Sequence, residues 1–106
     1  MPKPRRASLV WTRPALDGLL EITHYIMADN PSAARAFAEN IKTKVGRLRT
    51  FPESGRTVQE FPSSGLREVL IGDHRVIYRF LKSTRNVQVL AIHHGARLLD
   101  VEGPEN

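Results

Sequence analysis

The sequence predicts an α+β domain in which an N-terminal strand and an antiparallel helical hairpin pack on a small, mostly antiparallel sheet. Three observations lead to this fold class. Apolar residues recur at helical spacing over residues 15–48, they alternate at strand spacing from residue 66, and loops with proline and glycine separate the two regions. The 106 residues suffice for one core, and no repeat or linker marks a second, so residues 1–106 are expected to form a single domain.

Residues 7–11 are apolar enough to form a first strand, after a basic lead-in at residues 1–6. The next three residues, Thr12-Arg13-Pro14, predict the start of a helix, because threonine caps exposed N–H groups and proline suits a first turn. This helix should reach about Ala28. One apolar stripe along it is expected to face the core: Leu16, Leu19, Leu20, Thr23, Ile26 and Met27.

Residues 29–32 interrupt this helix and start a second one, with a side-chain cap at Asn30 or Ser32 and a proline early in the first turn. The second helix is predicted to run to about Arg49. Because the connection is so short, the two helices should form an antiparallel hairpin. The apolar stripe of the second helix consists of Ala34, Phe37, Ile41, Val45 and Leu48.

Two loops with proline and glycine follow, at residues 51–56 and 61–65, with at most a short edge strand between them. Alternating apolar residues then predict three strands, at residues 66–71, 74–81 and 87–93, joined by short turns. Consecutive strands of this kind form an antiparallel meander. The tail at residues 100–106 contains glycine and proline, has little to pack against and is expected to be loose.

The charge balance favours an acidic partner. The net charge is +5, and twelve of the sixteen basic residues are arginine, whose paired N–H donors fit phosphates and carboxylates. No apolar run reaches the roughly 20 residues that span a bilayer, and the N-terminus does not resemble a signal peptide. The chain has no cysteine, which excludes disulfides and thiolate chemistry. We therefore expect a cytoplasmic protein without membrane association.

The predicted strand at residues 74–81 carries different kinds of side chain on its two faces. Alternation places Arg75 and Arg79 on one face and Tyr78 on the other. The meander is expected to gather Arg67, Arg75 and Arg97 near one concave surface, where they could hold a phosphate or a developing negative charge. The alternative is that these arginines only pair with nearby acids, namely Glu60, Glu68 and Asp73.

Two adjacent histidines end the last predicted strand. Side chains of His93 and His94 should point to opposite faces, which argues against a metal ion shared by both. Either imidazole could still carry a proton near neutral pH. Glycines occur only singly at turns, so there is no glycine-rich phosphate loop. The sequence therefore predicts neither a metal site nor a cofactor.

The order and spacing of these features resemble the ParE/RelE superfamily of type II toxin–antitoxin toxins over about residues 10–99. Each segment alone is weak, but their order makes the match specific. The resemblance implies a helical hairpin on a small, mostly antiparallel sheet. The segments that carry it are Asp17 to Ile26, Asn30-Pro31 with Ala33-Ala34 and Phe37, Phe51-Pro52 with Gly55-Arg56, Gly65-Leu66-Arg67-Glu68, His74 to Arg79, and His94-Gly95-Ala96-Arg97.

The superfamily includes two activities: RelE-like members cut messenger RNA on the ribosome with basic, tyrosine or histidine side chains, and ParE-like members poison DNA gyrase. The strand that would carry RelE-like lysines contains none here, and no tyrosine follows Arg97. These absences favour a ParE-like plasmid-stabilisation toxin that inhibits gyrase and is not an enzyme. Its target-binding residues would be Arg67, Arg75, Tyr78, Arg79 and Arg97.

Two alternatives stay open. In a RelE-like endoribonuclease, Arg75 and Arg97 would hold the phosphate, His93 or His94 would move the proton, and Glu68 would add a carboxylate. In a non-toxic binding module, the arginines would only grip an acidic protein or RNA.

Either toxin activity implies a cognate antitoxin, ParD-like or RelB-like, and hence a toxin–antitoxin hetero-oligomer. In the family the C-terminal segment of the antitoxin folds onto the toxin, with a helix along the hairpin and an extended piece across the sheet. The expected antitoxin contacts are Arg35, Lys42 and Arg49.

Overall fold

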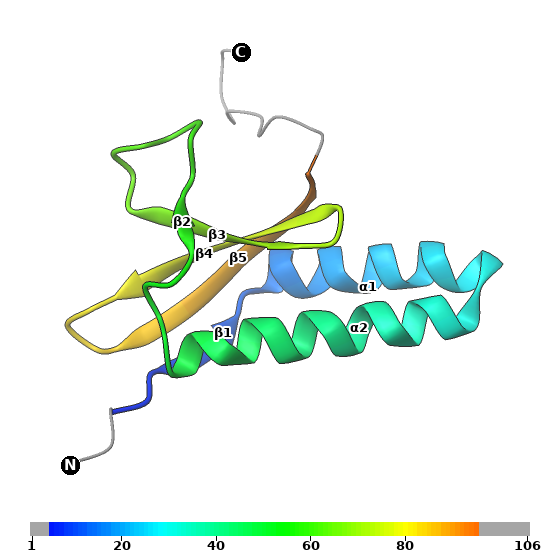
Figure 1. Cartoon of the computed structure of the whole chain (residues 1–106), viewed down its shortest axis with the longest axis horizontal. Helices are drawn as coiled ribbons and strands as arrows, with labels where there is room; N and C mark the ends of the chain where they lie inside the picture. Colours follow the sequence, from blue (N-terminus) through cyan, green and yellow to red (C-terminus); the bar gives the residue numbers. More distant parts are fainter. Residues whose placement is uncertain (1–4, 96–106) are drawn as a thin grey trace.

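The computed structural model describes residues 5–95, so the predictions for the loose tail and for Arg97 lie outside the described residues. Two helices pack on one face of a five-stranded mixed sheet (Figure 1). This confirms the predicted α+β fold, with its N-terminal strand, helical hairpin and mostly antiparallel sheet. Neither helix within the described residues is long and apolar enough to cross a membrane.

The predicted elements all occur, with small changes at their ends. The second helix continues into a short 3₁₀ helix, and the expected edge strand is only two residues long. In chain order the elements are β1 (Ser8–Trp11), α1 (Arg13–Asp29), α2 (Pro31–Gly46), the 3₁₀ helix η1 (Arg47–Arg49), β2 (Arg56–Thr57), β3 (Leu66–Ile71), β4 (His74–Leu81) and β5 (Asn86–His94).

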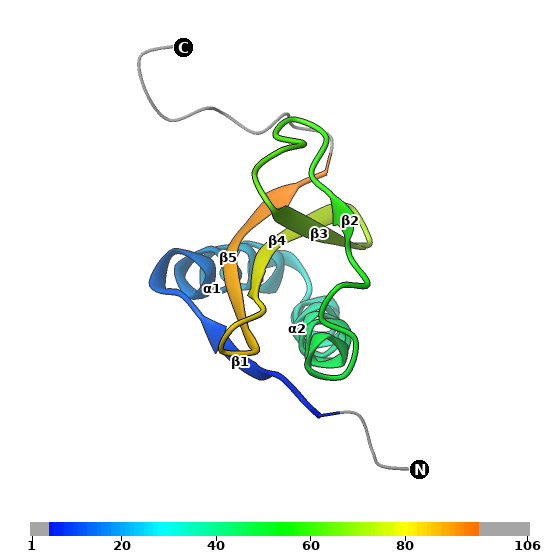
Figure 2. The same ribbon diagram turned by 90° about the vertical axis from the view of Figure 1, so that its left-hand side faces the viewer.

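The sheet has the strand order β1-β5-β4-β3-β2 and twists strongly from β1 to β2 (Figure 2). The β3–β4–β5 meander is antiparallel as predicted. The N-terminal strand β1 runs parallel to β5, with Ser8 opposite Asn86 and Trp11 opposite Val89. The first and last strands of the described chain are therefore neighbours in the sheet.

The caps of the two helices differ. Asn30 caps α2, since its side-chain oxygen accepts a hydrogen bond of 3.0 Å from the backbone N–H of Ala33. Thr12 precedes α1, but its hydroxyl makes no cap bond and instead donates to the backbone oxygen of Val89 at 2.8 Å. The predicted threonine cap was therefore wrong, because this side chain ties the start of α1 to strand β5.

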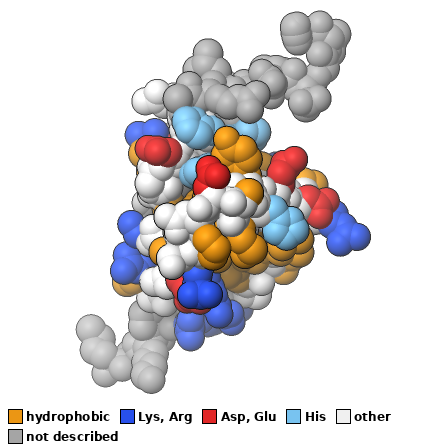
Figure 3. Space-filling view, turned by 90° about the vertical axis from the view of Figure 1, so that its right-hand side faces the viewer, with side chains coloured by type: hydrophobic (Ala, Val, Ile, Leu, Met, Phe, Trp, Pro, Cys, Tyr) orange, Lys and Arg blue, Asp and Glu red, His pale blue; other side chains and the backbone are white. Residues whose placement is uncertain are grey.

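The core lies between the helices and the sheet. Helix α2 contributes Ile41 and Val45, as its predicted stripe requires. On α1 the prediction was partly wrong: Leu16, Leu20 and Met27 are 40%, 55% and 47% exposed. The inward face of α1 carries Leu19, which the predicted stripe included, together with Ala15 and Ile22, which it did not. Several hydrophobic side chains also reach the surface at the end of the molecule where α1 meets α2 (Figure 3).

The two faces of the sheet differ in character. The helices cover the face that carries Val76 and Tyr78, both of which are buried in the core. The register places Arg75 opposite Leu70 and Ile77 opposite Glu68 on the other face. We call this second face, which the helices do not cover, the open face.

Candidate functional site

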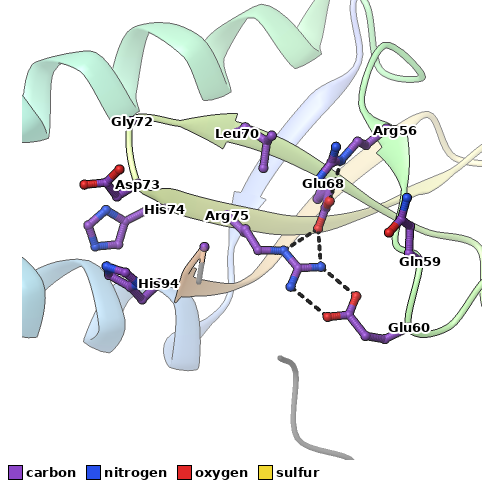
Figure 4. A pocket seen from close by; sticks show the side chains of 11 residues that line it. Arg56, Gln59, Glu60, Glu68, Leu70, Gly72, Asp73, His74, Arg75 and His94 are labelled. Atoms are coloured by element: carbon purple, nitrogen blue, oxygen red, sulfur yellow. Dashed lines mark hydrogen bonds and ion pairs between the residues drawn. The ribbon is translucent and has the colours of Figure 1, made fainter. Parts of the chain in front are cut away.

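A network of four charged side chains lies on the open face, next to a pocket of about 560 Å³ (Figure 4). Arg75 of β4 donates through Nε to Glu68 of β3 at 2.7 Å, and through its two terminal nitrogens to Glu60 at 2.8 and 2.7 Å. The second oxygen of Glu68 accepts from Nε of Arg56 at 2.6 Å. Strand pairing explains the arrangement, because Arg56 lies directly opposite Glu68 on β2 and β3.

The centre of this network is removed from water. The side chains of Arg75 and Glu68 are 8% and 0% exposed, whereas that of Arg56 is 56% exposed. The hydrogen bonds that Arg75 donates to Glu60 raise the pKa of Arg75 above its ordinary value, burial opposes this rise, and Glu68 adds to it. Arg75 is therefore permanently charged, and carboxylates already occupy its donors.

The histidines at the end of β5 point to opposite faces, as predicted. His93 lies opposite Arg75 on the open face, whereas His94 lies opposite His74. The ring centroids of His74 and His94 are 5.6 Å apart, and the ring of Phe37 of α2 also packs edge-on against His74, with centroids 5.1 Å apart. Burial lowers the pKa of His74, the charge of His94 lowers it further, and Asp73 partly opposes the shift. Within residues 5–95 no group of three or more His, Asp or Glu is arranged to hold a metal ion.

The structure does not bring Arg67 and Arg75 together. Arg67 lies opposite Tyr78 and so belongs to the face that the helices cover, whereas Arg75 lies on the open face. The prediction that both contribute to one concave surface was wrong. Tyr78, the partner of Arg67, and Arg75 lie an odd number of positions apart along β4, so their side chains project to opposite sides of the sheet. Arg67 donates to the backbone oxygen of Gly55 at 2.8 Å, near Glu53.

Tyr78 is fully buried and holds the loop that follows the helices. Its hydroxyl donates to the backbone oxygen of Pro52 at 2.8 Å and accepts from the N–H of Gly55 at 2.9 Å. A Cβ at position 55 would lie 2.6 Å from the Tyr78 ring, so only glycine allows this approach. Burial raises the pKa of Tyr78. Of the predicted target-binding residues that the structure describes, Arg79 on β4 is the exposed one.

A second candidate site is an apolar groove of about 530 Å³ between the helical hairpin and β1. Lys42 and Arg49, two of the predicted antitoxin contacts, line it, but Arg35 does not. Sequence reasoning missed the groove itself. The signal was present in the small residues Ala38 and Gly46 of α2, which leave space beside the larger side chains Trp11, Leu16, Leu19 and Ile41.

Residues 9–99 match the family model described as the ParE toxin of the type II toxin–antitoxin system parDE. Among curated relatives, "Toxin RelE2" of Caulobacter vibrioides is 36% identical over 92 residues, which cover 87% of this chain and 99% of that protein. "Putative toxin Y4kP" of Sinorhizobium fredii is 34% identical over 89 residues, covering 84% of this chain and 88% of that protein.

Solved structures with the same architecture agree. The chromosomal ParDE toxin–antitoxin system from P. aeruginosa contains a chain that matches with a TM-score of 0.67 and 25% identity, covering 85% of this chain and 97% of that one. A chain of the RelBE2 complex from Mycobacterium tuberculosis matches with a TM-score of 0.59 and 19% identity, over 84% and 98% of the two chains, which supports the fold alone. Because the family model spans most of the sequence, the chain belongs to the ParE toxin family and is a toxin of a type II toxin–antitoxin system.

Proposed function

We propose that this toxin arrests growth by poisoning DNA gyrase in the cytoplasm and that a cognate antitoxin neutralises it. The observation that carries the choice of target is the state of Arg75. Its guanidinium is held by Glu60 and Glu68 and is largely shielded from water. An arginine in this state stabilises the fold of the open face and does not present donors to a phosphate.

Ribonuclease chemistry on the open face would require this network to open. A scissile phosphate would have to displace Glu60 from Arg75, and Glu68 would stay beside it as a buried negative charge. Breaking a buried ion pair costs about 3–5 kcal/mol. The buried Glu68 is also bonded to two arginines, which makes it a poor general base. These features support gyrase inhibition, as does the match to the ParE family model.

Ribosome-dependent cleavage of messenger RNA is the second candidate. Two observations favour it: a relative with 36% identity is named RelE2, and His93 lies beside Arg75 on the open face, where it could transfer a proton. His94 fits this role less well, because its ring packs against His74 on the other face.

The apolar groove supports the antitoxin part of the proposal. Its lining is mainly hydrophobic, with Lys42 and Arg49 among the residues around it. An amphipathic helix with acidic residues at its edge would bury apolar surface there and pair with both cations. One matching solved structure is itself a ParDE toxin–antitoxin system.

The test is to induce the toxin in growing cells and to measure plasmid supercoiling, gyrase-linked DNA breaks and cuts in translated messenger. We expect gyrase-linked breaks and loss of supercoiling with intact messenger. Arg79→Gln should weaken this effect, whereas Arg13→Gln, which removes an exposed cation at the start of α1, should not. Messenger cuts that disappear in His93→Gln, with normal supercoiling, would establish the ribonuclease instead. Unimpaired growth would favour a non-toxic binding module.

A further inference from the structure

The end of α2 and the following 3₁₀ helix carry cations on two different sides. Lys42 and Arg49 line the apolar groove. Lys44 and Arg47 line a separate hollow of about 390 Å³, which the loop at Ser54 and Gly55, strand β3 and Arg56 of β2 complete. We call Lys44, Arg47 and Arg56, with the space between them, the basic hollow. No part of the proposed gyrase or antitoxin contact uses it.

The cations of the basic hollow are available for a ligand. Among the residues that the structure describes, neither Lys44 nor Arg47 forms a side-chain hydrogen bond or ion pair. Arg56 bonds Glu68 through Nε, and more than half of its side chain is exposed. Glu68 is the acidic residue in the wall, and Arg56 and Arg75 both neutralise it. Positive charge therefore exceeds negative charge around the hollow.

The chemistry of the lining selects the kind of ligand. The hollow has an apolar floor of Leu48, Val69 and Leu70, and its cations and the Ser54 hydroxyl match the oxygens of phosphate. The groove on the other side of α2 has a larger share of apolar surface and suits a protein helix. No aromatic side chain lines the basic hollow, so the bases of a single strand would find nothing to stack on.

We propose that the basic hollow binds the sugar–phosphate backbone of double-stranded DNA. The choice of duplex DNA rests on the proposed function, because gyrase acts on DNA and a toxin bound to it lies close to a duplex. Binding through phosphates alone is independent of base sequence and weakens steeply as salt increases. The hollow would thus add a DNA contact to the recognition of the enzyme.

A structural role for the same cations gives a different expectation. Basic residues near the C-terminus of a helix stabilise it by interacting with the helix dipole. If Lys44 and Arg47 act only in this way, their replacement lowers the melting temperature and leaves DNA binding unchanged. The experiment therefore measures stability and DNA binding on the same variants.

The test uses the full chain made by cell-free synthesis and a short fluorescent DNA duplex, titrated by anisotropy at several salt concentrations. We expect the double variant Lys44→Gln/Arg47→Gln to bind roughly tenfold more weakly at low salt, and the slope of log K against log salt to fall by about two. The matched control is Arg6→Gln/Arg13→Gln, which removes the same charge from exposed positions elsewhere. It should bind like the unchanged protein.

The outcomes separate the proposals. If the two double variants have the same DNA affinity and the same slope of log K against log salt, the DNA site is overturned. It is also overturned if the basic hollow binds single-stranded RNA or polyglutamate more tightly than the duplex. If only Lys44→Gln/Arg47→Gln has a lower DNA affinity and a smaller salt slope, with an unchanged melting temperature, the DNA site is supported. Since the titration contains no gyrase, it can succeed or fail independently of the supercoiling assay that tests the proposed function.

Discussion

Arg75 pairs with the carboxylates of Glu60 and Glu68, and the side chain of Glu68 is completely buried. Replacing Arg75 with alanine would leave Glu68 charged, with Arg56 as its only described partner. We expect Arg75→Ala to lower the free energy of unfolding by about 3–5 kcal/mol, measured by urea denaturation. The paired change Arg75→Met with Glu68→Leu should recover most of this loss, because it removes the fully buried carboxylate of Glu68 together with its arginine partner. A loss below about 1 kcal/mol for the single variant would contradict the assigned role.

His74 makes stability depend on pH. Its pKa is lowered by burial first and by His94 second, against an ordinary value of 6.5, and Asp73 partly opposes the shift. The unfolded chain therefore binds this proton more readily than the folded one. The stabilising contribution is complete above about pH 6.5 and is lost as pH falls from there through the lowered pKa.

Urea midpoints measured from neutral pH to about pH 5 check this expectation. The fall in stability should be shallower in His74→Gln than in the unchanged protein. Because His74 also packs against Phe37, its replacement can change stability at every pH. The comparison therefore uses the slopes of the urea midpoint against pH and not the midpoints themselves. The control is His24→Gln, which removes an exposed imidazole from α1 and leaves the His74–Phe37 contact intact. Parallel slopes for both variants would rule out His74 as the source.

At the scale of elements, periodicity predicted nearly all of the fold. The helical hairpin and the β3–β4–β5 meander follow from local spacing, which needs no knowledge of distant partners. The apolar stripe of α1 was harder, because the prediction placed both Leu16 and Leu19 against the core and only Leu19 packs there. Spacing predicts that a stripe exists, but packing against β5 decides which part of it is covered.

The site depended on information that spacing does not carry. Alternation correctly placed Arg75 and Tyr78 on opposite faces of β4. The relative register of β3 and β4 then decided that Arg67 shares a face with Tyr78 and that Glu68 shares the open face with Arg75, which bonds it. A shift of one residue would reverse both results. The acidic partners of Arg75 could be proposed from the sequence, but their geometry could not.

The two faces of the hairpin should respond differently to truncation. Ile41 of α2 is completely buried, so Ile41→Ala should cost about 2–5 kcal/mol of unfolding free energy. Leu20 of α1 is more than half exposed, and Leu20→Ala should change the unfolding free energy by less than about 0.5 kcal/mol. Urea denaturation of both variants measures the contrast. A large loss for Leu20→Ala would mean that the outer surface of α1 is covered in the free toxin.

At the scale of the whole molecule, the first strand depends on the last. β1 pairs with β5, and Thr12 bonds the backbone of Val89, so the pairing of the N-terminal strand requires β5 to be in place. The core joins both halves, since Ala7 and Ile41 belong to one hydrophobic cluster with residues of β4 and β5. This connectivity predicts that the chain unfolds in a single cooperative transition.

Trp11 makes this prediction measurable, because it is the only tryptophan and lies on β1 beside the apolar groove. Its fluorescence reports the packing of β1 against the helices, whereas far-ultraviolet circular dichroism reports the helices and the sheet together. In urea the two signals should change at the same midpoint, with an m-value of about 1–3 kcal/mol/M. An earlier fluorescence transition would show that β1 detaches while the hairpin and meander stay folded. In that case the apolar groove, one wall of which β1 supplies, would open before the rest of the toxin unfolds.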